Sequence, residues 1–348
     1  MSFVCLSHAS NVMSAAGDLA PLHLGSFGVR IFFILSGYLI TTLLMRDRAR
    51  HGGLSFGRFY FRRTLRILPP YYVYLAGVAL LMVFGALPRD PAVRWLPAWL
   101  YYSNVISTRS WYIGHGWSLS VEEQFYLLWP AMFVGGWWVR GQRGAVWAAG
   151  ALFVAGPLFR VLSVAGTHRV GETSPWQFDA LAAGCLVALL PVATANIVRQ
   201  SRVVAGVVVA AVLMQLVVVG NSFHWLVAIG IAIASAAGAI ALALGIAWCV
   251  ANPCGAVGRV LNWRPLRALG LISYSLYLWQ QLWFAPWLGA RHLGVSGLAL
   301  ATTGTLACAV ASFWLVEQPS LRLRAWAERL LPASGERLSP PALSQTLG

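Results

Sequence analysis

Residues 111–130 have the sequence WYIGHGWSLSVEEQFYLLWP, in which polar groups stand at the start of an apolar run. Glu122 and Glu123 are adjacent in this run, and a charged side chain at the centre of a membrane helix costs roughly 2.5–3.5 kcal/mol on insertion scales. Charged groups that persist inside an apolar segment usually serve chemistry or transport. The alternative is that both carboxylates lie just outside the bilayer and cap the helix.

The composition around this stretch indicates a membrane protein. Hydrophobic residues make up 59% of the 348 residues and charged residues only 10%, against about 25% charged in a typical globular domain. One soluble core cannot bury that much apolar surface. We therefore predict an all-α, polytopic bundle of transmembrane helices with about ten spans of roughly 20 residues each. The first span is expected to be truncated at the N-terminus.

The distribution of charge predicts the orientation. All 25 basic residues are Arg, and 18 of them fall in segments assigned to the cytoplasmic side, as the positive-inside rule requires. This places the C-terminus in the cytoplasm and the chain in the plasma membrane as a multi-pass protein. Residues 1–330 form the predicted transmembrane domain, and residues 331–348, rich in Pro and Ser, form a disordered cytoplasmic tail. The net charge of +15 does not indicate nucleic-acid binding, because no soluble basic domain is present and the predicted partner is the lipid bilayer.

Helical geometry separates the two adjacent carboxylates. A helix that begins near Trp117 brings four side chains onto one face: Ser118, Glu122, Phe125 and Trp129. Glu123 points about 100° away from that face, so one carboxylate can face a cavity while the other caps the helix or pairs with an Arg. His115 immediately precedes the helix and can approach the same pocket on the outer side.

A basic cluster precedes the paired prolines at residues 69–70. Arg62 and Arg66 are four residues apart, and Arg63 and Arg66 are three apart, so each pair shares a helix face. Arg binds phosphate through paired donors, and the cluster can hold the diphosphate of a nucleotide-containing donor at the cytoplasmic side. Contact with lipid headgroups together with topology control is the competing interpretation.

Isolated polar residues in other spans extend the candidate site. A neutral His8 can accept a proton from an alcohol, although a hydrogen-bonded interfacial His is the simpler interpretation. Ser36 and Gly37 are explained by close helix packing. Asp179, the only acid in its span, is either functional or paired with an Arg of a neighbouring helix, and Glu317 is expected to pair with a cytoplasmic Arg. The five Cys residues are scattered and predict neither a metal site nor a disulfide framework.

Together these motifs resemble the integral-membrane acyltransferase 3 family over nearly the whole chain. The resemblance is carried by His8 and by six further pieces in the same order: GVRIFFILSGYLI at residues 28–40, FRRTLRILPPYY at 61–72, HGWSLSVEEQFYLLWP at 115–130, FDALAAG at 178–184, SYSLYLW at 273–279 and EQP at 317–319. Two departures stand out. The Arg that usually precedes the first-span His by eleven residues would lie before Met1, and Gln280 stands where the family often has a His.

The resemblance implies a role for each matching position. His8 matches the His that activates the acceptor hydroxyl or relays the acyl group. Arg63 and Arg66, with Arg62 beside them, match the motif that grips an acyl-coenzyme A donor. Glu122 matches the more regular Glu of its motif and is favoured over Glu123 as the catalytic carboxylate. The remaining candidate site residues are His115, Trp117, Ser118, Glu123, Asp179, Ser273 and Tyr277.

The implied activity is transfer of an acyl group, most often acetyl, from acyl-coenzyme A to a hydroxyl. The acceptor would be a carbohydrate, a lipid-linked sugar or a metabolite, and no permanently bound cofactor or metal is expected. A transporter or flippase for a lipid-linked glycan or acyl group is the alternative from another functional class.

Overall fold

The computed structural model of the chain describes residues 24–106, 108–167, 177–190, 206, 224–285 and 294–330. Within these ranges every regular element is a helix, which confirms the predicted all-α class. The elements are α2 (Leu24–His51), α3 (Phe56–Val83), α4 (Trp95–Trp99), η2 (Ser103–Val105), α5 (Trp111–Gly114), α6 (Gly116–Arg140), α7 (Gln142–Thr167), α8 (Phe178–Leu189), α11 (His224–Ala251), α12 (Ala256–Leu261), α13 (Arg264–Leu271), α14 (Ser273–Trp283), α15 (Gly294–Ser312), the π-helical turn η4 (Phe313–Glu317) and α16 (Gln318–Leu330).

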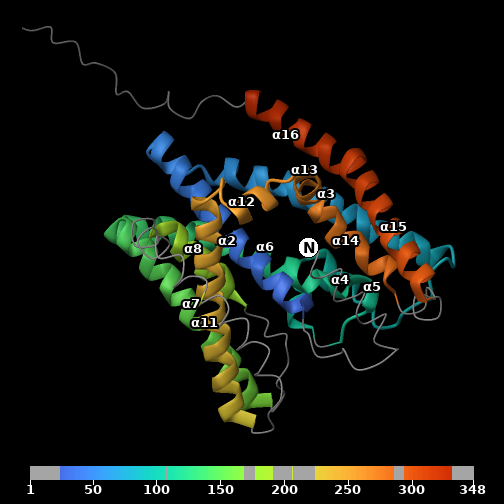
Figure 1. The fold of residues 1–348 in the computed structure, drawn as a ribbon, viewed down its shortest axis with the longest axis horizontal. Coiled ribbons are helices and arrows are strands. Elements are labelled where there is room, and N and C mark those ends of the chain that lie inside the picture. The colour runs from blue at the N-terminus through green and yellow to red at the C-terminus, as the bar shows by residue number, and fades with distance from the viewer. Residues whose placement is uncertain are drawn as a thin grey trace, which may run out of the picture.

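The described helices pack in two groups. In the first group α2 packs on α8, α6 on α7, and α11 on both α7 and α8. In the second group α14 packs on α15, while α3 contacts α14, η4 and α16. Figure 1 shows α7, α8 and α11 on one side of α2 and α6, and α14, α15 and α16 on the other. The boundary between the groups therefore runs along α3 and α6.

Five described segments are long and apolar enough to cross a membrane. They are Phe27–His51, Phe56–Val83, Gln142–Leu162, Ala232–Ala251 and Ser296–Leu330. These segments support a membrane protein, whereas the ten spans and their orientation stay predictions. The helix α6 is not among the five although it has 25 residues, because Ser, Glu, Gln and Gly lower its mean hydropathy.

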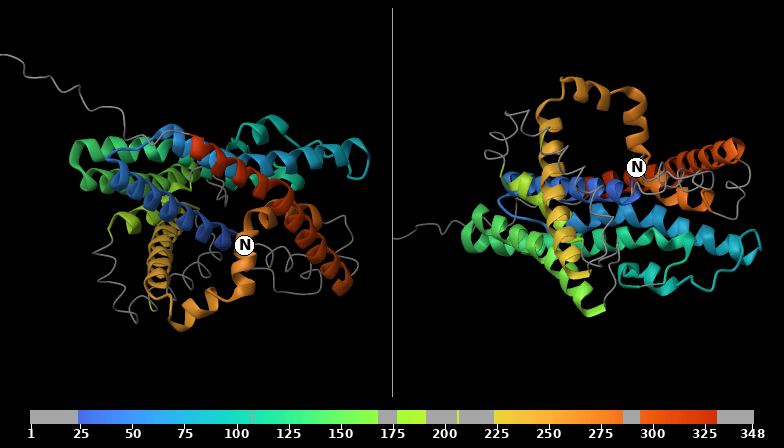
Figure 2. Two further views of the ribbon diagram at one scale, coloured as in Figure 1. Left: turned by 90° about the horizontal axis from the view of Figure 1, so that it is seen from above. Right: turned by 60° about the horizontal axis from the view of Figure 1, so that its bottom comes forward.

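The apolar run at residues 268–288 has the length of one span, but the structure divides it. The helix α13 ends at Leu271 and α14 begins at Ser273. No residue of α13 is buried, so only the part from Ser273 onward packs into the bundle. Figure 2 shows α12 and α13 as an arch between α11 and α14, set off from the other helices. The predicted first span with His8 and the tail at residues 331–348 lie outside the described residues.

The contact between α2 and α8 depends on two glycines. A Cβ atom at Gly37 would lie 1.9 Å from the carbonyl oxygen of Leu181, and one at Gly184 would lie 2.1 Å from that of Ile34. Small residues allow helix backbones to approach this closely in membranes. The packing role expected for Gly37 from the sequence is therefore confirmed.

Replacing Gly37 with Ala is expected to destabilise the protein by about 1–3 kcal/mol, the usual cost of overpacking. The methyl group would collide with the backbone of α8. A backbone atom cannot avoid the collision by a change of side-chain rotamer, so one of the two helices would have to shift. Thermal unfolding in detergent would measure the effect. Gly150→Ala in α7 is the matched control, because a Cβ there meets nothing within 4 Å. Equal stability of the two variants would contradict the prediction.

Candidate functional site

Side chains from α3 and α6 meet along the boundary between the two groups of helices. The Tyr60 hydroxyl donates to the carbonyl of Leu127 at 3.0 Å, and the Arg63 guanidinium lies 4.5 Å from the centroid of the Tyr126 ring. At the other end, the Tyr71 hydroxyl lies next to Gly116. The two helices therefore run in opposite directions, and their facing surfaces carry most of the predicted site.

Glu122 is the most highly connected carboxylate in this region. Its side chain is buried and accepts hydrogen bonds from the hydroxyls of Ser36 and Tyr126, which themselves lie 3.0 Å apart. The guanidinium groups of Arg63 and Arg66 are close enough to interact with it electrostatically. Residues from α2, α3 and α6 thus converge on one carboxylate.

The sequence interpretation missed two of these partners. Ser36 was assigned to helix packing, but in the structure its neighbour Gly37 makes the close approach while Ser36 binds Glu122. Tyr126 lies one turn after Glu122, and the spacing of four residues places both on one face of α6. That spacing was visible in the sequence, whereas the contact with Ser36 needed the packing of α2 against α6.

The three Arg residues predicted to bind the donor face in different directions. Arg63 is half-buried against α6, and Arg66 is exposed. The Arg62 Nε atom instead donates to Oε1 of Glu328 at 2.8 Å, which ties α3 to α16. Arg66 therefore lies at the surface and Arg63 between the surface and Glu122. Arg62 already has a carboxylate partner.

A second buried carboxylate, Glu317, lies beside the first turn of α14. It ends the π-helical turn η4 and accepts a hydrogen bond from Ser275, whose hydroxyl lies 3.1 Å from that of Ser312. Arg66 is close enough to Glu317 for electrostatic interaction. The expected pairing of Glu317 with an Arg is therefore electrostatic, since no direct ion pair joins them among the described residues.

The segment SYSLY at the start of α14 connects three parts of the bundle. The Tyr274 hydroxyl donates to the carbonyl of Ile67 on α3 at 2.8 Å, and Ser275 binds Glu317. The Tyr277 hydroxyl lies 3.0 Å from the carbonyl oxygen of His115. Ser273 is half-buried and begins the helix. These hydroxyls hold α14 against its neighbours, so the motif has an evident structural role.

His115 and Ser118 form a separate cluster at the start of α6. The His115 ring is buried between the rings of Tyr74 and Tyr277, with centroid distances of 5.2 and 5.4 Å. Ser118 hydrogen-bonds both the His115 carbonyl and the Tyr277 hydroxyl. Seven residues of helix separate His115 from Glu122, about 10 Å along the axis, so His115 is not part of the immediate Glu122 cluster.

Trp117 packs against α2 and the loop that precedes α5. Its ring makes an edge contact with Phe33 at a centroid distance of 6.2 Å, and the Arg109 guanidinium lies 5.8 Å from its centroid. Trp117 therefore lies in the first turn of α6, on a different face of the helix from Glu122.

Asp179 belongs to a different site. Its buried carboxylate lies 3.4 Å from Arg30 on α2 and 3.0 Å from Arg160 on α7. Arg30 also donates to the hydroxyl and the carbonyl of Ser235. Of the two interpretations left open by the sequence, the structure shows the pairing with Arg residues of neighbouring helices.

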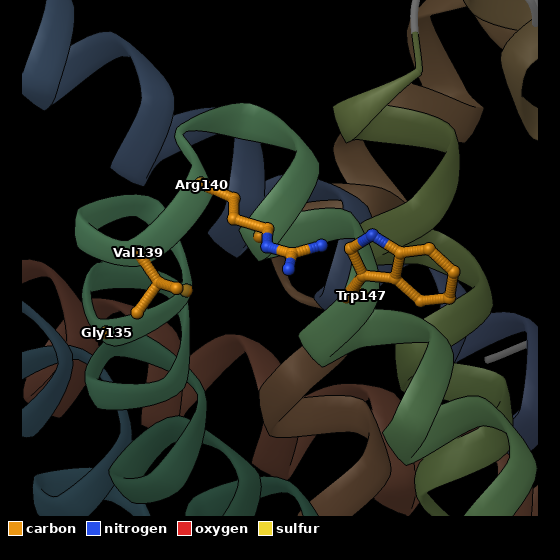
Figure 3. A pocket seen from close by; sticks show the side chains of 6 residues that line it. Gly135, Val139, Arg140 and Trp147 are labelled. Atoms are coloured by element: carbon orange, nitrogen blue, oxygen red, sulfur yellow. The ribbon is translucent and has the colours of Figure 1, made fainter.

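One pocket in the described part of the chain lies apart from this arrangement. It has a volume of about 550 Å³ and lies where α6 turns into α7; the residues that line it are Gly135, Gly136, Val139, Arg140, Gly144 and Trp147. Figure 3 shows Arg140 reaching from the end of α6 toward Trp147 on α7. None of the predicted site residues contributes to it.

The fold and the site define a class of protein: an all-helical membrane protein with a buried carboxylate facing two Arg residues. The family described as "Acyltransferase domain" matches residues 1–316. This chain belongs to that family, the acyltransferase 3 family.

Three relatives illustrate the similarity. The putative peptidoglycan O-acetyltransferase YrhL of Bacillus subtilis is 30% identical over 284 residues, which cover 73% of this chain and 43% of that protein. Peptidoglycan O-acetyltransferase OatA of Listeria monocytogenes is 26% identical over 322 residues, with 85% and 51% covered. O-acetyltransferase OatA of Staphylococcus aureus is 29% identical over 281 residues, with 73% and 45% covered. The chain spans about half the length of these relatives, and no solved structure matches it.

Proposed function

We propose that this chain transfers an acetyl group from acetyl-coenzyme A to a hydroxyl of a carbohydrate or lipid-linked acceptor. The donor binds from the cytoplasmic side of the plasma membrane, and the acceptor approaches from the outer side. The observation that carries this proposal is the placement of Arg63 and Arg66 beside the buried Glu122. The names of the relatives support acetyl as the acyl group and a cell-wall glycan as the acceptor.

The proposed reaction follows from these groups. Arg63 and Arg66 bind donor phosphates through charge-assisted hydrogen bonds. The acceptor oxygen attacks the thioester carbonyl, a carbon–oxygen bond forms, the carbon–sulfur bond breaks and coenzyme A leaves as the thiolate. His8, aided by Glu122, takes the proton of the hydroxyl and returns it to the sulfur. If His8 instead carries the acyl group, a carbon–nitrogen bond to its ring forms as the carbon–sulfur bond breaks, and that bond breaks in turn when the acceptor oxygen forms the carbon–oxygen bond.

The function is tested with the purified chain in lipid nanodiscs, supplied with acetyl-coenzyme A and soluble peptidoglycan fragments. We expect thiol release and acetylated fragments without any ion gradient. Absence of both would contradict the proposal and favour the alternative of a transporter. An acetylated His8 trapped before the acceptor is added would identify this residue as an acyl carrier, and its absence would favour the role of a base.

Replacing Arg63 or Arg66 with Ala is expected to raise the KM for acetyl-coenzyme A roughly tenfold to a hundredfold. A hydrogen bond to a charged group contributes about 1.5–3 kcal/mol, and each 1.4 kcal/mol corresponds to about a tenfold change. Arg62→Ala is expected to have a smaller effect, because Glu328 already binds this side chain. Steady-state kinetics measures all three, with the exposed Arg259→Ala as the control. If Arg63→Ala and Arg66→Ala left the donor KM unaltered, the proposal that these residues bind the donor would be wrong.

A further inference from the structure

Tyr101 has a backbone conformation that usually belongs to glycine. It follows α4, whose end is closed by hydrogen bonds from the amide of Tyr102 to the carbonyl of Pro97 and from the amide of Tyr101 to that of Ala98. This pattern is the Schellman motif, in which the residue after the cap is left-handed and most often Gly. Tyr101 occupies that position with a φ of 53°, the only positive φ among the described residues other than glycine.

A bulky residue in this conformation is strained, and such strain often marks a functional site. Glycine would close the same turn without the strain, so the turn itself does not require a tyrosine. What the tyrosine adds is its side chain. The ring is buried, 9% exposed, with its centroid 4.6 Å from that of Tyr71 on α3.

The hydroxyl of Tyr101 has no hydrogen-bond partner among the described residues although it is buried. Burial raises the pKa of this hydroxyl far above its ordinary value, so it stays protonated and is available as a donor. Buried polar groups without partners are rare in folded proteins and call for an explanation.

Glu123 carries a second buried atom of the same kind. Its Oε1 atom has no hydrogen-bond partner in the described part of the chain, whereas the neighbouring Glu122 receives two hydroxyls. The loop that carries Tyr101 is fastened beside it, because the side-chain amide of Gln124 donates to the Tyr101 carbonyl at 2.9 Å. Tyr101 and Glu123 are close enough to interact electrostatically, and Arg63 is close enough to Glu123 to do so.

We propose that Tyr101 and Glu123 together bind a hydroxyl of the acyl acceptor next to the one that reacts. An alcohol both donates and accepts a hydrogen bond, so this hydroxyl can donate to a carboxyl oxygen of Glu123 while its own oxygen accepts from the Tyr101 phenol. The reacting hydroxyl keeps its proton for His8. This inference rests on the proposed acyl transfer and adds Tyr101, to which the resemblance gave no role. The adjacent acids then have separate tasks: Glu122 serves the chemistry beside the donor, and Glu123 orients the acceptor.

The test uses the full chain in nanodiscs, acetyl-coenzyme A and soluble peptidoglycan fragments as the acceptor probe. We expect Glu123→Leu and Tyr101→Phe each to raise the KM for the fragments about threefold to tenfold, because each variant removes one hydrogen-bond partner of the acceptor. The donor KM should change less than the acceptor KM in both variants. Tyr102→Phe is the matched control and should leave both constants unchanged.

Tyr101→Phe also separates binding from stability, because it keeps the buried ring against Tyr71 and removes only the hydroxyl. Its unfolding temperature should therefore stay near that of the wild type. If the variants lower the unfolding temperature but leave the acceptor KM unchanged, the two polar atoms hold only a structural water and the inference is wrong. It is equally wrong if the donor KM rises in place of the acceptor KM. Wild-type protein that neither cleaves acetyl-coenzyme A nor acetylates the fragments would overturn the proposed function, and the inference with it.

Discussion

Replacing Glu122 with Gln is expected to lower the turnover of acyl transfer by roughly two to four orders of magnitude, the usual contribution of a general acid–base group. The fold should survive, because the amide oxygen of Gln can still accept hydrogen bonds from Ser36 and Tyr126. What the variant loses is the ability to exchange a proton beside Arg63 and Arg66. Turnover with saturating acetyl-coenzyme A and acceptor measures the effect.

Two milder variants serve as controls for Glu122→Gln. Ser36→Ala and Tyr126→Phe each remove one hydrogen bond to the Glu122 carboxyl group and keep its ability to exchange a proton. Both should therefore retain more activity than Glu122→Gln. If Glu122→Gln kept more than about a tenth of the wild-type turnover with an unchanged unfolding temperature, the assignment of Glu122 as a catalytic residue would be wrong.

Replacing Asp179 with Ala is expected to destabilise the protein by about 3–5 kcal/mol, because removing one partner of a buried ion pair leaves uncompensated charge. Here the loss would leave Arg30 on α2 and Arg160 on α7 without their shared carboxylate. Since α8 contacts both of those helices, the first group of helices should loosen as a whole. Unfolding in detergent and the amount of protein recovered from membranes measure the effect.

Two controls test whether the effect of Asp179→Ala comes from the burial of the ion pair and from the charge left behind. Asp47→Ala removes an acid from a partly exposed pair with His51 at 3.3 Å, and such surface pairs contribute about 1 kcal/mol or less. Replacing Asp179, Arg30 and Arg160 together with apolar residues should be less damaging than Asp179→Ala alone, since no buried charge remains. Wild-type stability of Asp179→Ala would show that the ion pairs do not hold these helices together.

Helical periodicity predicted much of the candidate site. The face of α6 that carries Ser118, Glu122 and Trp129 is buried, while Glu123 beside it is only half-buried. Of the Arg residues, Arg62 and Arg66 share a face as their spacing of four predicts, since Arg66 interacts with Glu317 and Arg62 with Glu328 on the connected elements η4 and α16. Spacing along one helix is a local property, so it can be read without knowing the neighbours.

The partners of these side chains could not be predicted in the same way. The sequence left Asp179 between a functional role and an ion pair, and it assigned Ser36 to packing alone. The contact between Ser36 and Glu122 joins residues 86 positions apart, and the contact between Arg30 and Asp179 joins residues 149 apart. Helical periodicity gives the direction of a side chain around the axis of its own helix. It does not tell which other helix lies opposite that side chain.

The adjacent glutamates in residues 111–130 show most clearly which properties follow from the sequence and which depend on the tertiary structure. Apolar composition and helical period determined, without further information, that this is an all-helical membrane protein and that Glu122 and Glu123 point in different directions. Only the tertiary structure decided that Glu122 is surrounded by hydroxyls and Arg residues while Glu123 has a buried oxygen without a partner beside Tyr101. The reason is physical: periodicity follows from hydrogen bonding within one helix, whereas the environment of a side chain depends on segments brought together by packing.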